Sequence, residues 1–312
     1  MQAQRTLHAG RKRSPVPELR SPTIRRRELG ALLRTLRLEQ GLTVDQVAGR
    51  LLCSPSKVSR METGQRGATA RDVRDLCDLY GVTSAGERAR MAKLAAEGKQ
   101  QGWWQSYELD YFATYVGLEE AATTLCYYQS TIVPGLLQTA AYARAMHRGS
   151  MPAEFTPERA DELIEVRIRR QQVLTRDPPM QLRVVLDEAV LHRVVGSRSV
   201  MAAQLRHFIA VASRPNVTLQ VIPFSVGAHP AMENMFNIID FGDVVPRVVY
   251  VEGLMGWLFL ERENDIARYT QVFDYLCELA LDPQETIELI SEVGARYTTA
   301  RSPSSEDVLN SQ

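Results

Sequence analysis

The sequence lacks the features that would place a chain in or across a membrane. It has no run of about 18 apolar residues, the length that spans a bilayer as a helix. The nearest candidate, residues 248–260, is interrupted by Glu252. The basic residues near the N-terminus are not followed by an apolar stretch, so we expect no signal peptide. We expect a cytoplasmic protein with no membrane partner.

Cysteine is scarce. The four cysteines, Cys53, Cys77, Cys126 and Cys277, lie far apart and form no C-x-x-C pair. We therefore expect neither a zinc site nor a disulfide framework, and a reducing compartment fits this usage.

Common motifs of catalysis and cofactor binding are also missing. The sequence has no Walker A motif, no G-x-G-x-x-G, no H-E-x-x-H and no G-x-S-x-G. We expect no catalytic residue, no cofactor and no metal ion. Six residues of the second half could form an acid–base or metal site, but their spacing does not require it. Structural roles are favoured because charged residues and histidines are common at strand ends. The six residues are Asp187, Glu188, His192, His229, Glu233 and Glu252.

The chain does have a strong asymmetry of charge. Its 37 basic and 37 acidic residues cancel overall. Residues 1–102 contain 20 Lys and Arg against 10 Asp and Glu, whereas residues 103–312 contain 17 against 27. A basic half favours a polyanionic partner such as double-stranded DNA, and an acidic half does not.

The length of 312 residues and the hydrophobic content of 45% suit two globular domains. The two ends are rich in serine, proline or charge, and bury too little apolar surface to offset the entropy of ordering. We expect a disordered basic arm over 1–22, a helical domain over 23–98, a hinge at 98–102, an α+β domain over 103–297 and a disordered tail over 298–312.

The first domain is predicted to contain five short helices. Apolar residues recur at helical spacing from Ile24 onward, and each helix is bounded by a capping residue or a glycine. Pro55 suits the first position of the third helix, where a missing N–H costs nothing. The expected N-caps are Thr43, Ser54, Thr69 and Ser84, and the expected stops are Gly41, Gly64 and Gly81.

A short turn joins the second and third helices, which is the geometry of a helix-turn-helix. Ala48 is small where the helices cross, and Val58 and Met61 face inward. Residues 24–81 resemble the lambda-repressor-like (XRE-type) helix-turn-helix domain. The matching segments are Leu29-Gly30-Ala31-Leu32-Leu33-Arg34, Gly41-Leu42-Thr43, Val47-Ala48, Val58-Ser59-Arg60-Met61-Glu62-Thr63-Gly64 and Leu79-Tyr80-Gly81.

The resemblance implies which residues contact DNA. Pro55, Ser56 and Arg60 occupy base-facing positions of the recognition helix, while Thr43 and Lys57 match positions that hold phosphates. The alternative for Arg60 and Lys57 is an ordinary solvated charge. The expected DNA-binding residues, with the outward-facing Ser59, are Thr43, Pro55, Ser56, Lys57, Ser59 and Arg60.

Two further residues carry expectations about this domain. Glu62 is expected to be a structural partner inside the domain and not a reader of bases. The chain has Leu52 in the inter-helix turn, where the family often has glycine, so we expect modest strain there.

The second domain is predicted to hold a small mixed sheet. A helix over 200–212 links the first two strands, which favours a parallel pair, and short connections favour antiparallel pairing of the later strands. The expected strands are 182–186, 217–222, 236–241 and 247–251, with helices over much of 103–175, 266–281 and 284–294. The chain as a whole is expected to be mainly α with a small mixed β-sheet.

Residues 103–295 resemble the antitoxin-like C-terminal domain of unresolved activity that follows this helix-turn-helix in many actinobacterial regulators. The segments that carry the resemblance include Trp103-Trp104, Val133-Pro134-Gly135-Leu136-Leu137-Gln138-Thr139, Arg169-Arg170-Gln171, Leu186-Asp187-Glu188-Ala189 and Gly227-Ala228-His229-Pro230.

Aromatic residues gather at the start of this domain, with eight of the chain's 22 between 103 and 128. Aromatic side chains with polar tips suit ligand pockets and interfaces, and a helical core beside the hinge is the alternative. A histidine in a loop can hydrogen-bond a ligand. The expected ligand or partner residues are Trp103, Trp104, Tyr107, Tyr127, Tyr128 and His229.

The leading functional hypothesis is a sequence-specific DNA-binding transcriptional regulator. Its C-terminal domain would sense a small-molecule effector or a partner protein and mediate homodimerisation, because one short recognition helix reaches only a few base pairs. One alternative is an antitoxin-like protein that mainly binds a small partner protein and autoregulates its operon. Another is an enzyme that carries a DNA-binding domain.

Overall fold

The computed structural model describes residues 21–107, 109, 112–150, 156–253 and 256–299. Most of the predicted arm, over 1–20, and most of the predicted tail, over 300–312, lie outside the described residues. The described residues extend two positions into the predicted arm and two positions into the predicted tail. Ser21 and Pro22 are buried, the first helix begins at Pro22, and the last helix ends at Thr299.

The N-terminal domain contains the five predicted helices. Their boundaries follow the capping residues: Thr43 and Thr69 each accept a hydrogen bond from the third residue of the helix, within a reciprocal capping box. Gly41, Gly64 and Gly81 all have positive φ after a helix end. The helices are α1 (Pro22–Glu39), α2 (Val44–Arg50), α3 (Pro55–Glu62), α4 (Ala70–Leu79) and α5 (Ala85–Glu97).

The C-terminal domain is built on a mixed sheet that has six strands in the described residues, in the order β3-β2-β1-β4-β5-β6. The neighbours of β2 are parallel to it, and β4, β5 and β6 continue the sheet by antiparallel pairing. The strands are β1 (Thr124–Gln129), β2 (Gln181–Asp187), β3 (Val217–Ile222), β4 (Phe236–Asp240), β5 (Val248–Gly253) and β6 (Gly256–Leu260).

The sheet confirms the predicted class and pairing and corrects two details. β2 and β3 are parallel and β4 and β5 antiparallel, as expected. β1 lies in a region expected to be helical, and its residues are nearly all buried, so the strand lacks the alternation that marks a half-exposed one. β6 was not expected, since β5 and β6 both fall within the largely apolar stretch 248–260.

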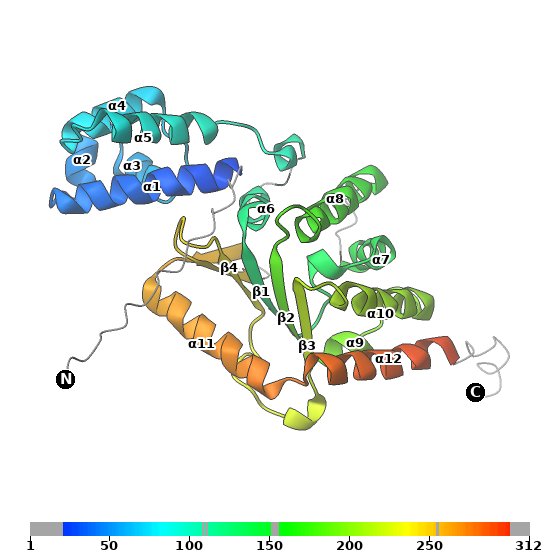
Figure 1. Cartoon of the computed structure of the whole chain (residues 1–312). Coiled ribbons are helices and arrows are strands. Elements are labelled where there is room, and N and C mark those ends of the chain that lie inside the picture. The colour runs from blue at the N-terminus through cyan, green and yellow to red at the C-terminus, as the bar shows by residue number, and fades with distance from the viewer. Residues whose placement is uncertain (1–20, 108, 110–111, 151–155, 254–255, 300–312) are drawn as a thin grey trace, which may run out of the picture.

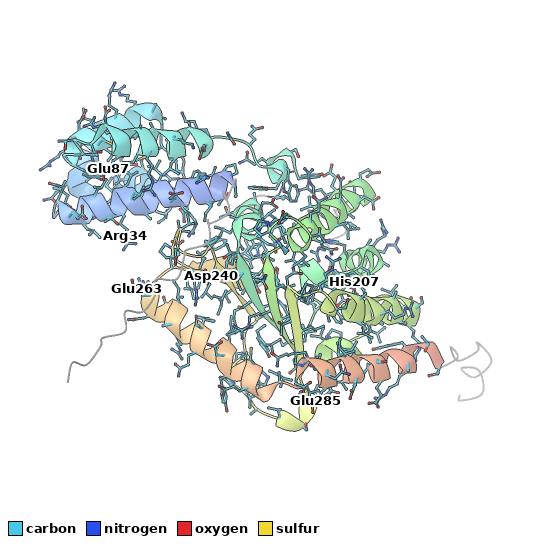
Figure 2. The ribbon with its side chains drawn as sticks, in the orientation of Figure 1. Arg34, Glu87, His207, Asp240, Glu263 and Glu285 are labelled. Carbon is cyan, nitrogen blue, oxygen red and sulfur yellow. The ribbon has the colours of Figure 1, made fainter. Side chains whose placement is uncertain are left out.

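Helices cover both faces of the sheet (Figure 1). One face carries α7 (Ala140–Ser150), α8 (Pro157–Arg170), α10 (Arg198–Ala212) and α12 (Pro283–Thr299), and the other carries α11 (Glu263–Leu279). His207 on α10 and Glu285 on α12 mark the first of these sides in Figure 2. Alternate residues of β1 divide between the two cores: Leu125 and Tyr127 join the larger one, while Cys126 and Tyr128 pack toward α11.

The two domains share a packed junction as well as the segment 98–102. The hydroxyl of Ser21 donates to the carbonyl of Gly117 at 2.9 Å, on α6 (Phe112–Ala121). Ile24 on α1 is fully buried in the larger core of the C-terminal domain. Arg27 pairs with Glu261 at 2.6 Å. The start of α1 therefore belongs to both domains, and the expected hinge is only one of their two connections.

Candidate functional site

The first candidate site is the exposed face of α3. Ser54 caps this helix by accepting from the N–H of Lys57, and Pro55 occupies its first turn. Val58 and Met61 are buried beneath it. Its angle against α1 depends on Gly30, because a Cβ there would lie 2.5 Å from the carbonyl oxygen of Met61. Close packing on one side leaves the opposite side of α3 free to face a partner.

Most of the residues expected to contact DNA are exposed, and those on α3 lie on its outer side. Arg60 extends along its own helix and its Nε donates to the carbonyl of Ser56 at 3.3 Å. Within the described residues, no hydrogen bond or ion pair joins these exposed side chains to the C-terminal domain. The structure thus presents the surface uncovered. The exposed residues are Thr43, Pro55, Ser56, Ser59 and Arg60.

Lys57 differs from the others because it is half-buried and paired. Its Nζ lies 2.5 Å from Oδ1 of Asp72, which connects α3 to α4. Burial tends to raise the pKa of Asp72, but hydrogen bonds from Lys57 and Thr69 outweigh it, so the pKa lies below its usual value. A phosphate would have to share Lys57 with this carboxylate.

Glu62 is a structural partner inside the domain, as the sequence indicated. Arg37 holds its carboxylate through Nε at 2.7 Å and Nη2 at 2.9 Å, and a third nitrogen donates to the carbonyl of Leu42 at 2.8 Å. The pair fixes α3 against α1 and the turn that starts α2. Burial and the Glu62 charge raise the pKa of the nearby Tyr80 to about 12.

The inter-helix turn has the conformation expected of a position where glycine is common. Leu52 has φ +51° and its side chain is 94% exposed. A left-handed conformation is uncommon for a residue with a Cβ, so the turn carries the modest strain that was predicted.

The expected ligand residues at the start of the C-terminal domain form a small core of their own. Trp104 is buried beside Val116 and Val166. The indole N–H of Trp103 donates to Glu120, and the hydroxyl of Tyr107 donates to Glu165 at 2.8 Å. The ring of Trp103 contacts the rings of both Trp104 and Tyr107. In the described part of the chain, none of these three side chains contacts Tyr127, Tyr128 or His229.

The other three expected ligand residues lie on opposite sides of the sheet. Tyr128 and His229 lie together, with the hydroxyl 3.4 Å from Nε2, and Nε2 is 3.6 Å from Oδ2 of Asp187. Tyr127, one residue away, points to the other face and joins a buried polar network around Glu119 and Arg170. Sequence reasoning missed this network because its members come from four separate elements.

Four of the six acid–base candidates lie at the end of β2 in two pairs, Asp187 with His229 and Glu188 with His192. Glu188 accepts from Nε2 of His192 at 3.1 Å and from the N–H of Phe224 at 2.8 Å, which are contacts that secure the end of β2. Glu252 lies on β5, far from these residues in the sequence. No group of three or more metal-ligating side chains was found among the described residues.

Comparisons with known proteins give the two halves separate assignments. Residues 28–91 match a helix-turn-helix domain, which suggests DNA binding. Residues 112–292 match a domain of unknown function, DUF5753. The chain therefore belongs to the DUF5753 family, with a helix-turn-helix domain in front of that domain. No curated protein and no solved structure matches it. Among the described residues, no helix is long and apolar enough to cross a membrane.

Proposed function

We propose that this protein is a sequence-specific transcriptional regulator of the lambda-repressor-like type, which binds double-stranded DNA through α3. The observation that carries the proposal is the polar, exposed face of α3, supported from behind by a buried pair between Arg37 and Glu62. Exposed side chains of such a helix reach base edges in the major groove. Arg60 is the residue best suited to read a base, because a guanidinium can donate two hydrogen bonds to guanine.

The surrounding charge supports the same proposal. Residues 1–102 hold twice as many basic as acidic side chains. Arg34 on α1, labelled in Figure 2, and Arg50 at the end of α2 are exposed on this domain. Such charges attract phosphates irrespective of sequence, which supplies affinity and orientation while α3 supplies discrimination.

We propose that the regulator acts as a homodimer. Two recognition helices related by a two-fold axis double the number of base pairs read, and their half-sites lie about 34 Å or a multiple apart. The acidic C-terminal domain is the proposed dimerisation surface, because two basic domains repel each other. Static light scattering of the full chain at micromolar concentration tests this, and a monomer with and without DNA would contradict it.

The C-terminal domain is proposed to act by binding rather than by catalysis. The shared junction at α1 and α6 supports a role in controlling the helical domain, since a change at α6 is in direct contact with Ser21 and Ile24. A specific observation also supports partner-protein binding, the antitoxin-like alternative. β6 is an edge strand, and its Leu258 is 54% exposed. Exposed edges accept an added strand from another chain.

The experiment that tests the proposed function starts without an assumed operator. Full-length protein selects duplexes from a random-sequence library, and footprinting then locates the protected bases on the selected DNA. We expect a two-fold related consensus, and enrichment of no sequence over the starting library would contradict the proposal. Co-purification of a small protein from cells, with its release on mutation of Leu258→Asp, would favour the alternative.

A further inference from the structure

A cavity of about 100 Å³ opens between the sheet and the helices of the larger core. Its floor is a row of side chains that the strand register places side by side. Tyr127 on β1 is opposite Asn237 on β4, and Asn237 is opposite Tyr250 on β5. Gln129 lies two residues beyond Tyr127 on the same face of β1, and also lines the cavity.

The hydrogen bonds under the cavity fix which atoms face into it. Arg170 binds the buried carboxylate of Glu119 through Nε and Nη2, at 2.6 and 2.8 Å. Tyr127 donates to that carboxylate at 3.0 Å and therefore accepts from Tyr115, whose hydroxyl is 2.6 Å away. Burial keeps the pKa of both tyrosines well above its usual value, so both phenols remain protonated.

The sequence of hydrogen-bond donors and acceptors continues to Asn237. The hydroxyl proton of Tyr115 is used toward Tyr127, so Tyr115 accepts from Nδ2 of Asn237, at 3.1 Å. That orients the amide and leaves its oxygen, Oδ1, as an acceptor without a partner among the described residues. The order follows from a carboxylate that can only accept, and it fixes the orientation of the Asn237 amide.

Three buried polar atoms around the cavity thus lack a hydrogen-bond partner in the described part of the chain: Oδ1 of Asn237, Oε1 of Gln129 and the hydroxyl of Tyr250. Each of the three residues is more than nine-tenths buried. An unsatisfied buried polar group costs about 1–3 kcal/mol. Three such groups around one cavity indicate that the cavity binds a molecule that forms hydrogen bonds with them.

The cavity also has a cation without a countercharge in contact. Arg167 on α8 donates to Oε1 of Gln138 at 2.5 Å and makes no ion pair with any described residue. Burial and the neighbouring Arg170 charge lower its pKa to about 10. Arg170 is already neutralised by Glu119, so Arg167 is the group available to an anion. Glu252, which is exposed, lines the mouth.

The volume limits the size of the occupant. A cavity of 150 Å³ holds benzene, so 100 Å³ suits about four to six non-hydrogen atoms. Phe112 and Tyr250 contribute aromatic surface to the lining, which leaves room for a short apolar part.

We propose that this cavity is a ligand-binding site for a small organic carboxylate that carries an amine or hydroxyl donor, of the size of a small amino acid or hydroxy acid. The carboxylate pairs with Arg167, and the donor hydrogen-bonds to Oδ1 of Asn237 and Oε1 of Gln129. The hydroxyl of Tyr250 completes the contacts. Any regulatory use of the site rests on the proposed function, whereas binding itself does not.

A regulatory use has a direct structural basis. Tyr115 lines the cavity from α6 and packs in the same core as Ile24 of α1. The ligand would therefore contact the helix that holds the start of the DNA-binding domain. By linkage, any effect of the ligand on DNA affinity is matched by an equal effect of DNA on ligand affinity.

The test measures ligand binding to the full-length protein without DNA, by calorimetry and thermal unfolding. The probes are glycine, L-alanine and L-lactate, with propionate as a carboxylate lacking the donor and ethylamine as a donor lacking the carboxylate. We expect a rise in Tm of about 2 °C or more at millimolar concentration for at least one molecule that has both groups. Propionate and ethylamine should bind at least about tenfold more weakly.

Variants separate a binding site from a structural feature. Arg167→Gln should lower the affinity about tenfold, while Arg183→Gln, on the other face of the sheet, should bind as the wild type does. Tyr250→Phe should raise the Tm of the free protein, because it removes an unpaired hydroxyl. It should also lower the affinity for the ligand. A cavity filled by water alone would give no response to any probe and would overturn the proposal, as would equal binding by Arg167→Gln. Neither result would bear on DNA binding.

Discussion

The guanidinium of Arg37 and the carboxylate of Glu62 meet through two contacts, at 2.7 and 2.9 Å, with both side chains largely removed from solvent. The pair joins the last turn of α1 to the end of α3, so the orientation of the recognition helix depends on it. Removal of one partner leaves the other charge buried without compensation.

We therefore expect Arg37→Ala and Glu62→Ala each to destabilise the N-terminal domain by about 3 kcal/mol. The double variant Arg37→Leu/Glu62→Leu should lose less than the sum, because it leaves no unpaired charge. Urea unfolding followed by far-UV circular dichroism measures these values. Arg90→Ala, an exposed pair with Glu28, is the control and should change stability by less than about 1 kcal/mol. Single variants as stable as this control would contradict the account.

Lys57 gives a prediction about how DNA affinity depends on salt concentration. Its pairing with Asp72 means that a phosphate gains less from it than from a free lysine. Lys57→Gln should weaken binding to all DNA sequences alike, and lower the slope of log K against log salt by less than the about 0.9 expected per fully engaged cation. The measurement is affinity at several salt concentrations. A loss confined to the selected sequence would instead make Lys57 a base reader.

The junction of the two domains depends on Gly117. A Cβ at this position would lie 2.2 Å from Oγ1 of Thr23 and 2.9 Å from the ring of Trp104. Gly117→Ala should push α1 away from α6 and destabilise the protein by about 1–3 kcal/mol. We expect limited proteolysis to cut the segment 98–102 faster in this variant. Gly49→Ala, where a Cβ meets open space, is the control, and equal cleavage of both variants would contradict the shared junction.

The burial of His147 leads to a prediction about how stability depends on pH. This burial together with the charge of Arg167 lowers the pKa of His147 to about 4, from the usual 6.5. The unfolded chain therefore binds a proton more readily, and stability is lost as pH falls from 6.5 through 4. The effect is at most about 3 kcal/mol. His147→Gln should flatten the decline of Tm between pH 7 and 4.5. Parallel declines in the wild type and this variant would contradict the prediction.

The helices of the N-terminal domain could be predicted because their determinants are local. Thr43 and Thr69 cap the helices they precede, and glycines with positive φ end them, so a few neighbouring residues contain the whole signal. The position of Glu62 inside the domain could be inferred from its place on α3. Its partner Arg37 could not, because 25 residues separate them.

The fold of the C-terminal domain was harder to predict from the sequence, because its determinants are not local. β1 is buried on both faces, so its sequence shows no period of two and could not be separated from a buried helix. The cavity joins Tyr127, Asn237 and Tyr250 from three strands with Arg167 from α8. Only the register of the sheet brings these residues together, and the clustering of aromatics near residue 103 pointed to one of them alone.

The central claim is that α3 reads DNA bases, and Arg60 tests it most directly. The measurement compares Arg60→Ala with Arg90→Ala, which removes the same charge from α5, on a selected sequence and on unrelated DNA of equal length. The account predicts that Arg60→Ala costs about 1–3 kcal/mol on the selected sequence and much less on unrelated DNA, so specificity falls. Arg90→Ala should leave the ratio of the two affinities unchanged. An equal ratio in wild type, Arg60→Ala and Arg90→Ala would contradict the claim.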